Sequence, residues 1–446
     1  MRLNKAIKSV LLLAPILLAS CEPKPSTDNG NLSSPTTTTP TTNTTGPTTD
    51  DIIDDGNLHS VNNKVFPMGT KDDPFTNGVC KSLNIHLLEM NKKYGDSLII
   101  KCAAEKKEDD FTMLIDVGDD TDGKSAVNDA LKTIADNEID FAVFTHGHAD
   151  HINGFENAIG KNVDNVTIKN ILDFGYKYET KSYTTKYEQY RDKYVKEKKA
   201  NYCTAFDAVN NRVCSSKYYL AQDLTFEIFD TGHYINNPGT IIKNAGANDT
   251  SIAGILKYKD FSFFLSGDLD QEIDLLKLNP NLETVNLMKA GHHGSDTSNS
   301  DSLLQKIKPE NIIISAAAVA KANPDKPGTY YLDGRANDHP NPIALKRMFN
   351  SSAGTNVYTN LTMGTIVVDV DVTTLQYTIT GLGANRLVYE ISSESGEVIK
   401  TKEEIREFEK TAKLVDTYFY NNVQILNKGN KTLKELVDAL WKKEHF

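Results

Sequence analysis

The chain has 446 residues and a formal net charge of -11. This length suffices for one large domain or for two to three average ones, so it excludes little by itself. The acidic charge excludes a global basic field of the kind that dominates non-specific binding of nucleic acid. Any recognition of phosphate must therefore be local, and bound metal ions can supply positive charge for it.

The N-terminal residues have the composition of a secretory signal. Basic residues stand among the first eight, and the apolar run 10–18 follows before Cys21. This run is too short to span a membrane, and its terminal position disfavours a buried helix. The segment resembles a bacterial lipoprotein signal, which implies that residues 1–20 are a signal peptide and that Cys21 is lipidated. We therefore expect a lipid-anchored protein at the extracellular face of the cell membrane.

A polar segment follows the expected signal. Residues 21–60 are rich in Thr, Pro, Asn, Ser, Gly and Asp and contain few apolar side chains. Such a segment cannot bury enough apolar surface to offset the entropy lost on ordering, so it predicts a disordered tether. No later segment of the sequence is long and apolar enough to span a bilayer.

Four further cysteines remain: Cys80, Cys102, Cys203 and Cys214. An even number outside the cytoplasm favours disulfides. The first two flank a hairpin-like pair of strand runs, which would bring them close together, and the last two bracket a short polar loop. Neither pair has the spacing of a zinc ribbon. Free thiols remain the alternative for both pairs.

From about residue 83 onward, short β-rich runs alternate with helical ones. Strands are expected at 83–88, 97–102, 112–117, 141–145, 166–172, 225–230, 251–258, 261–266, 311–315 and 365–370. Helices are expected at 124–137, 270–278, 300–306 and 342–350. The pattern predicts a mixed α/β domain over residues 75–384, layered as a sandwich with its site at strand ends.

Two segments depart from this alternation. Residues 176–220 are rich in Tyr and Lys and suggest a helical insertion. Its tyrosines could stack nucleic-acid bases, or they could pack an amphipathic helix onto the sheet, which we favour. Residues 385–446 have the pattern of a charged helical C-terminal extension.

One short run carries most of the chemistry. Three histidines and one aspartate stand within six residues after an apolar run: His146, His148, Asp150 and His151. Imidazole and carboxylate are ligands of zinc and similar cations, and catalytic sites leave one position open for water. A chance cluster of this density is improbable, so the run predicts a metal site.

Further histidines and acids follow later strand runs. The run 261–265 ends at Asp268, whose carboxylate can bridge two cations. Seven of the ten histidines lie in or near such strand-end motifs: His146, His148, His151, His233, His292, His293 and His339. This clustering is a second, independent indication of a metal centre.

The chain resembles metallo-β-lactamase-fold hydrolases, in the branch related to the hydrolase domain of ComEC-type competence proteins, which internalise DNA. The H-x-H-x-D-H run marks the superfamily. The branch is marked by Gly95-Asp96-Ser97, by His292-His293-Gly294-Ser295 and by His339-Pro340. The resemblance spans roughly residues 83–370 and implies a four-layer αβ/βα sandwich. Competence proteins also carry a membrane channel, which this sequence lacks, so the resemblance does not imply DNA uptake.

The resemblance also implies two divalent metal ions, zinc or else manganese. The implied ligands are His146 and His148 for the first metal, Asp150, His151 and His293 for the second, and Asp268 as the bridge. His292 would face the substrate, although the roles of His292 and His293 could be exchanged. Asp150, His292 and His339 would be the catalytic residues.

Three more positions are tied to this site. Asp116 would orient the metal-binding loop, or else be a simple turn residue. Many relatives supply a third histidine to the first metal where this chain has Asn248, so His233 is the only nearby candidate for that ligand. The first metal site is therefore expected to be the weaker one. Residues 295–298 precede a helix, where they could seat a phosphate or only cap the helix.

The function that follows is cleavage of phosphodiester bonds by a metal-activated water, with nucleic acid as the leading substrate. Phosphocholine-type or other small surface phosphodiesters are the alternative substrates. An acyl hydrolase is disfavoured because no cysteine stands near Asp268 in the sequence. A non-catalytic binding or adhesion lipoprotein is the alternative of another class. No protein partner can be identified.

Overall fold

The computed structural model describes residues 69–90, 95–119, 126–179, 182–237, 239–315, 319–322, 330–333, 339–340, 342–354 and 356–383. Contacts divide the chain into two units, 1–53 and 54–446, and all described residues belong to the second. The expected signal peptide, Cys21, the tether and the extension 385–446 lie outside the described residues. Within the described part, no helix has the length and apolar character needed to cross a membrane.

Two sheets dominate the described residues. The first has the order β21-β20-β1-β2-β3-β5-β7-β9 and the second the order β10-β11-β13-β14-β15-β16-β19. The strands of the first are β1 (Ser82–Leu87), β2 (Leu98–Ala103), β3 (Phe111–Ile115), β5 (Phe141–Val143), β7 (Asn170–Asp173), β9 (Asn201–Thr204), β20 (Gly364–Val370) and β21 (Tyr377–Gly383). Those of the second are β10 (Lys217–Ala221), β11 (Leu224–Phe229), β13 (Ala253–Tyr258), β14 (Phe261–Leu265), β15 (Leu287–Lys289), β16 (Asn311–Ile314) and β19 (Val357–Thr359).

The remaining elements are short strand pairs and helices. The small pairs are β4 (Glu138–Ile139) with β6 (Thr167–Ile168), β8 (Lys177–Tyr178) with β12 (Ile241–Ile242), and β17 (Val319–Ala322) with β18 (Tyr330–Asp333). The α-helices are α1 (Ala126–Ile134), α2 (Ala149–Ile152), α3 (Phe155–Ala158), α4 (Ser182–Lys196), α5 (Ala205–Val209), α6 (Asn244–Ala247), α7 (Glu272–Leu278), α8 (Asp301–Ile307), α9 (Pro342–Asn350) and α10 (Asn360–Met363). Single 3₁₀ turns occur at η2 (Lys107–Asp109), η3 (Gly160–Asn162), η4 (Asn248–Thr250) and η5 (Gly291–Gly294).

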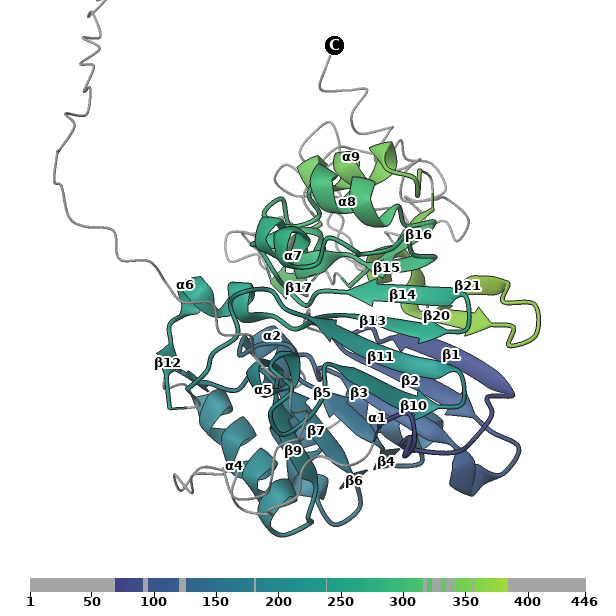
Figure 1. Ribbon diagram of the computed structural model, residues 1–446. Helices are drawn as coiled ribbons and strands as arrows, with labels where there is room; N and C mark the ends of the chain where they lie inside the picture. Colours follow the sequence, from purple (N-terminus) through teal and green to yellow (C-terminus); the bar gives the residue numbers. More distant parts are fainter. Residues whose placement is uncertain are drawn as a thin grey trace, which may run out of the picture. The chain divides into compact units, whose positions relative to one another are not determined.

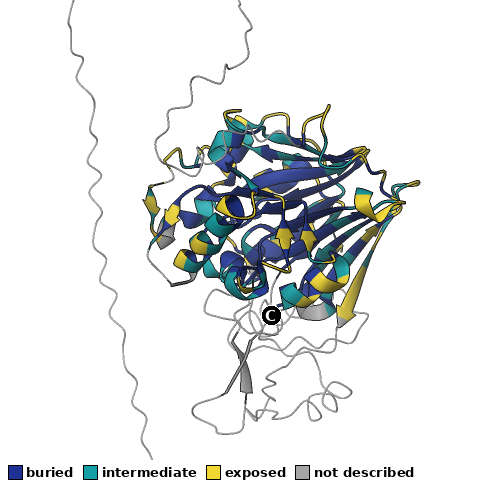
Figure 2. Cartoon of the chain, turned by 90° about the horizontal axis from the view of Figure 1, so that it is seen from below, coloured by how far each residue is buried: buried dark blue, intermediate teal, exposed yellow. Residues whose placement is uncertain are grey.

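The core between the two sheets is built by alternation along the strands. Leu83, Ile85 and Leu87 of β1 are buried while the residues between them are only partly covered, as a strand with one apolar face requires. Phe226 and Ile228 of β11 contribute to the same cluster from the second sheet. This shared apolar layer fixes the two sheets face to face, and Figure 2 shows their buried strands at the centre.

Helices cover the outer face of each sheet. Val127 of α1 and Tyr187 of α4 pack in one apolar cluster with residues of the first sheet. Leu275 of α7, Leu303 of α8 and Leu345 of α9 pack in another with the second sheet, beyond which Figure 1 shows these three helices. The order helix, sheet, sheet, helix confirms the predicted four-layer αβ/βα sandwich.

The segment 176–220 is only partly what the sequence predicted. It contains the expected helix, α4, and Tyr187 and Tyr194 of that helix are buried in the core, so they pack rather than stack bases. It also supplies β9 to the edge of the first sheet and β10 to the edge of the second. The segment therefore completes both sheets and does not interrupt them. These strands were missed because they lack a clear period-2 apolar pattern.

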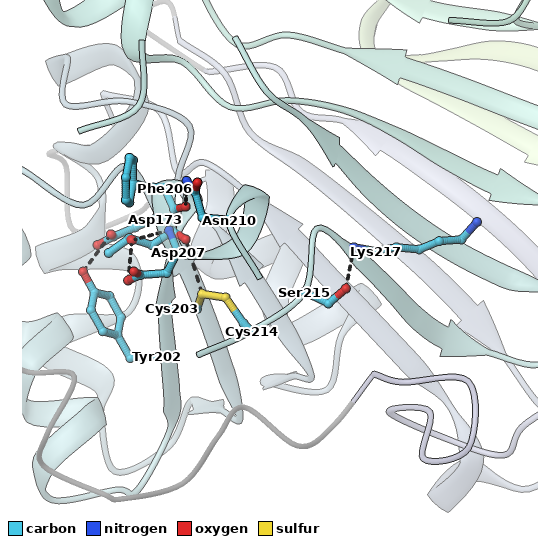
Figure 3. The surroundings of a disulfide bond; sticks show 10 residues. Asp173, Tyr202, Cys203, Phe206, Asp207, Asn210, Cys214, Ser215 and Lys217 are labelled. Carbon is cyan, nitrogen blue, oxygen red and sulfur yellow. Dashed lines mark hydrogen bonds between the residues drawn. A yellow bond between two sulfur atoms is a disulfide. The ribbon is translucent and has the colours of Figure 1, made fainter. Parts of the chain in front are cut away.

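Both predicted cysteine pairs are disulfide-bonded. Cys80 and Cys102 lie 5.1 Å apart between their Cα atoms, and Cys203 and Cys214 lie 6.3 Å apart. All four side chains are buried in the cluster between the sheets. Figure 3 shows the Cys203–Cys214 bond beside Asp207, where it ties β9 to the loop before β10.

Candidate metal centre

The histidine-rich run lies in the loop after β5 and enters a short helix. His148 precedes α2, so Asp150 and His151 lie on the first turn of that helix. His146 and His151 are fully buried, whereas His148 and Asp150 are half-buried. The loop therefore places these four side chains together at one end of the first sheet.

Asp268 is the meeting point of the site. It follows β14 of the second sheet, is 1% exposed, and its backbone N–H donates to Ser251 Oγ over 3.1 Å. Four imidazole Nε2 atoms lie within 4 Å of its Oδ2 atom: His151 at 3.1 Å, His293 at 3.5 Å, His146 at 3.8 Å and His292 at 3.9 Å. A single carboxylate oxygen thus faces imidazoles from both halves of the sandwich.

Two groups of potential ligands share this carboxylate. In each group the ligand atoms lie within 4.8 Å of one another. One group is His146, His148 and Asp268, and the other is Asp150, His151, Asp268 and His293. Either group could hold a divalent cation, with Asp268 common to both. The ligand atoms come together as the sequence motifs predicted.

The residues present fit such cations. His151 Nδ1 donates to Asp116 Oδ2 over 2.7 Å, and His293 Nδ1 donates to the Ser315 carbonyl over 2.9 Å. These bonds fix the tautomers, so the Nε2 lone pairs of both rings face Asp268. His151 Nε2 and Asp268 Oδ1 are buried without a hydrogen-bond partner among the described residues. An imidazole nitrogen and a carboxylate oxygen are the kinds of ligand atom that zinc or manganese binds.

The electrostatics of the centre also favour cations. Burial by itself lowers the pKa of His293, but the carboxylates of Asp268, Asp96 and Asp150 raise that pKa to about 10. Burial likewise opposes the shift at His151, whose pKa is nevertheless raised well above its usual value by Asp268 and Asp116. The centre is therefore a region of negative potential, which attracts positive charge.

Asp116 organises the histidine loop as predicted. Its Oδ1 accepts from the Thr145 N–H over 2.8 Å, and its Oδ2 accepts from Thr145 Oγ1 and His151 Nδ1, both over 2.7 Å. It is 1% exposed and stands at a φ of 54°, in the left-handed region. A strained residue whose carboxylate is fully used by one loop has an orienting role, and the simple-turn alternative does not account for these bonds.

The two adjacent histidines have different positions. Both adopt left-handed backbone conformations within η5, with φ of 45° for His292 and 51° for His293. Asn299 supports this strained turn, since its side chain bonds both the N–H and the carbonyl of Gly291 over 2.9 Å. The turn directs His293 Nε2 to within 3.2 Å of Asp150 Oδ2, inside a ligand group. His292 stays half-buried outside both groups, with Nδ1 at 3.0 Å from Asp270 Oδ1.

His339 lies beside this pair. Its ring centroid is 4.9 Å from that of His292 and 6.3 Å from that of His293. Burial and then the neighbouring imidazoles lower the pKa of His339 to about 3, so its ring is neutral near neutral pH. Its Nδ1 is buried without a hydrogen-bond partner among the described residues. His339 can therefore act there as a neutral hydrogen-bonding group.

His233 does not reach the centre. Its Nε2 lies 3.2 Å from Asp274 Oδ2, its side chain is 30% exposed, and it joins neither ligand group. The structure therefore does not bring His233, the candidate third histidine of the first metal, into either ligand group. It follows the positive-φ turn at Gly232 and pairs with an acid of α7. Asn248 lies closer to the centre than His233 does: its Nδ2 atom is 3.1 Å from Asp270 Oδ2 and 3.4 Å from His292 Nδ1.

Three functional acids or bases were missed by the sequence motifs. Asp270 accepts hydrogen bonds around His292, and Lys289 forms a buried ion pair with Asp96 beside His293. Glu272 accepts from the N–H groups of Asn299 over 2.6 Å and Ser300 over 2.8 Å. No local spacing signals these residues, because each acts on a partner from a distant segment.

The structure does not support helix capping by residues 295–298. Ser300 is the N-cap of α8, and its side chain accepts from the Leu303 N–H. Glu272 accepts from the N–H groups of Asn299 and Ser300, which directly precede the helix. The cap therefore lies just after residues 295–298, with a buried carboxylate beside it.

Comparison with known proteins agrees with this geometry. Residues 96–317 match the family described as the Metallo-beta-lactamase superfamily. A segment of 74 residues is 32% identical to the ComE operon protein 3 of Bacillus subtilis (strain 168). This match covers 16% of the chain and 9% of that relative.

Two solved structures align with parts of the chain at low sequence identity. The metallo-beta-lactamase fold protein YhfI from Bacillus subtilis aligns with a TM-score of 0.36 at 11% identity, over 65% of this chain and 100% of that one. The short form of human tRNase Z aligns with a TM-score of 0.31 at 12% identity, over 52% of this chain and 92% of that one.

Proposed function

The chain contains a domain of the metallo-beta-lactamase superfamily, and we propose that this domain is a metal-dependent hydrolase of phosphodiester bonds that acts on nucleic acid. The observation that carries the proposal is that two ligand groups share the carboxylate of Asp268, whose Oδ2 atom also lies within 4 Å of the Nε2 atoms of four imidazoles. Two bound divalent ions would supply a water acidified toward neutral pH and positive charge opposite the attacked phosphoryl group. The positive charge of the ions would offset, at the site, the net negative charge of the chain.

The chain's own residues would position the reacting groups. Asp150 has a half-buried carboxylate beside His293 and can accept a proton from an attacking water. His292 is 20% exposed and is held by Asp270 through Nδ1, so its Nε2 can donate to a phosphoryl oxygen or a leaving group. His339, a neutral ring next to His292, can donate or accept at the same place.

A phosphodiester fits this site better than an acyl substrate. The residue shared by both ligand groups is a carboxylate, and shared two-metal sites suit in-line displacement at phosphorus. No cysteine of the described residues belongs to a ligand group, because all four are held in disulfides in the core between the sheets. The thiolate ligand of some β-lactamases therefore has no equivalent among the described residues.

The test is a cleavage assay with the purified full-length chain. Single-stranded and double-stranded DNA, RNA, a chromogenic phosphodiester and a phosphocholine ester are each incubated with Zn²⁺ or Mn²⁺. We expect cleavage of nucleic acid by the wild type, loss of cleavage in Asp268→Asn, and full activity in His233→Ala. Cleavage of the small esters alone would contradict the nuclease assignment. No cleavage of any substrate, with metal bound, would favour a binding or adhesion protein.

We also propose that the enzyme acts outside the cytoplasm and is anchored through a lipid on Cys21. The two buried disulfides support this location, because such bonds persist in oxidising compartments. Labelling of cells with a radioactive fatty acid tests the anchor. The label should appear on the wild type and disappear in Cys21→Ser, and equal labelling of both would refute the anchor at this residue.

A further inference from the structure

We propose that the turn Gly95–Ser97, together with the buried ion pair between Asp96 and Lys289, is a positioning device that holds the ligand-bearing loops of both halves of the sandwich in register. This inference deepens the proposed function and rests on it. The turn was singled out in the sequence as a family mark, but none of its side chains belongs to a ligand group centred on Asp268.

Backbone bonds tie this turn to the first half of the site. The Asp96 N–H donates to the Asp150 carbonyl over 3.0 Å, and the Gly118 N–H donates to the Asp96 carbonyl over 2.8 Å. Ser97 Oγ donates to the Asp116 carbonyl over 3.0 Å. The turn therefore holds both the loop that carries Asp150 and the loop that carries Asp116.

The approach at Asp150 leaves room only for glycine at position 95. Gly95 has a φ of 144°, and a Cβ built there would lie 2.3 Å from the Asp150 carbonyl oxygen. Such a distance is far inside van der Waals contact, and the obstacle is backbone that cannot move aside alone. Close packing of the turn against the ligand loop thus depends on the missing side chain.

Side chains tie the same turn to the second half of the site. Lys289 ends β15, forms an ion pair with Asp96 Oδ2, and donates to the Ala290 carbonyl over 2.9 Å. Asp96 Oδ1 lies 3.4 Å from His293 Nδ1. A second route runs through Ser315, whose Oγ donates to the Gly95 carbonyl over 2.7 Å while its carbonyl accepts from His293 Nδ1. His293 is therefore connected to the turn twice.

Burial and charge exclude two other roles for the pair. Asp96 and Lys289 are each 1% exposed, so the ammonium cannot reach a substrate in solution. Asp96, Asp116 and His151 also lie close enough to form a third cation site. However, Asp116 accepts from Thr145 and His151, and Asp96 pairs with Lys289, so both carboxylates already have partners in the protein. A buried pair of this kind is best explained by the geometry that it fixes.

The pair can be tested with Asp96→Asn, Lys289→Met and the double variant in the full-length chain. The matched control is Lys257→Met, which removes an ion pair with Glu283 on the protein surface. The readouts are the affinity for Zn²⁺ and for Mn²⁺ in competition with a chromogenic chelator, the unfolding temperature, and kcat and KM on a chromogenic phosphodiester. Metal affinity is measured without substrate, so it tests the pair even if the phosphodiesterase proposal fails.

We expect each single variant to lose about 10-fold or more in metal affinity and to lower kcat with little change in KM, because the pair does not touch substrate. The double variant should recover much of the unfolding temperature, since no unpaired charge remains buried, but not the metal affinity. Native affinity in the single variants would overturn the proposal. So would a double variant in which affinity returns together with stability.

Ser315→Ala provides a milder test in case the charge variants do not fold. It removes only the bond from Ser315 Oγ to the Gly95 carbonyl and leaves the bond from His293 to the Ser315 carbonyl. We expect a measurable loss of metal affinity, smaller than that of the charge variants, with an unfolding temperature close to that of the wild type. Unchanged affinity in a folded Ser315→Ala protein would contradict the positioning role.

Discussion

His293 Nε2 lies 3.2 Å from Asp150 Oδ2, although 143 residues separate them in the chain. Asp150 lies on α2, which follows β5 of the first sheet, and His293 lies in the strained turn η5, which follows β15 of the second. The candidate metal centre therefore exists only when both sheets are packed against each other.

Replacement of the shared carboxylate should abolish the centre. In Asp268→Asn, a neutral amide replaces the negatively charged carboxylate that faces four imidazoles. We expect loss of bound metal and a fall in activity of roughly 100-fold or more, because the charge is lost to both ligand groups. Native metal content in the folded variant, measured by mass spectrometry, would show that Asp268 is not the shared ligand.

Asp116→Asn tests the orientation of the histidine loop. The amide can still accept from Thr145, but its NH₂ group opposes the N–H of His151, so the imidazole loses its fixed tautomer. We expect metal affinity to fall by about 10–100-fold, with a smaller effect on folding. Chelator competition measures the affinity and circular dichroism the folding. A metal affinity equal to that of the wild type would show that Asp116 is a simple turn residue and does not orient the histidine loop.

Removal of the Cys203–Cys214 bond should lower stability without touching the site. The bond closes a loop of 11 residues, and loops of this size contribute about 2–4 kcal/mol to the free energy of unfolding. The variant Cys203→Ser/Cys214→Ser should therefore unfold at lower denaturant concentration, as should the wild type with reductant. Identical unfolding curves with and without the bond would contradict its structural role.

Glu272 should make the free energy of unfolding depend on pH in a defined direction. Burial raises the pKa of this carboxyl above its usual value, although the helix amides that it accepts from oppose the shift. A carboxyl with a raised pKa in the folded state favours folding below its unfolded pKa and loses that contribution as pH rises through the folded pKa. Denaturant unfolding of the wild type and Glu272→Gln should therefore diverge above about pH 4.5, with the wild type losing stability relative to the variant. A constant difference across this range would refute the shift.

The ligand set could be predicted from the sequence because it is encoded locally. His146 and Asp268 closely follow apolar strands, and His151 stands in the same short run as His146, so motif and position are found together. The choice between His292 and His293 could not be made, because it depends on two consecutive left-handed residues, which no spacing reveals. The structure assigns His293 to a ligand group.

The fold was predicted in its layers but not in all of its strands. The strands with clear alternation, such as β1 and β11, stand close to their predicted positions. β9 and β10 were hidden in the Tyr- and Lys-rich segment, because an edge strand is specified by its neighbour more than by its own pattern. Lys289 and Glu272 were missed for a related reason, since their partners are remote in sequence.

The most direct test of the account is the metal content of the purified full-length chain after dialysis against Zn²⁺ or Mn²⁺, compared with Asp268→Asn and with His233→Ala. We predict about two divalent ions per chain in the wild type and in His233→Ala, and fewer than one in Asp268→Asn. A wild-type chain that holds fewer than one ion, or an Asp268→Asn chain that holds as many as the wild type, would contradict a metal centre built around Asp268.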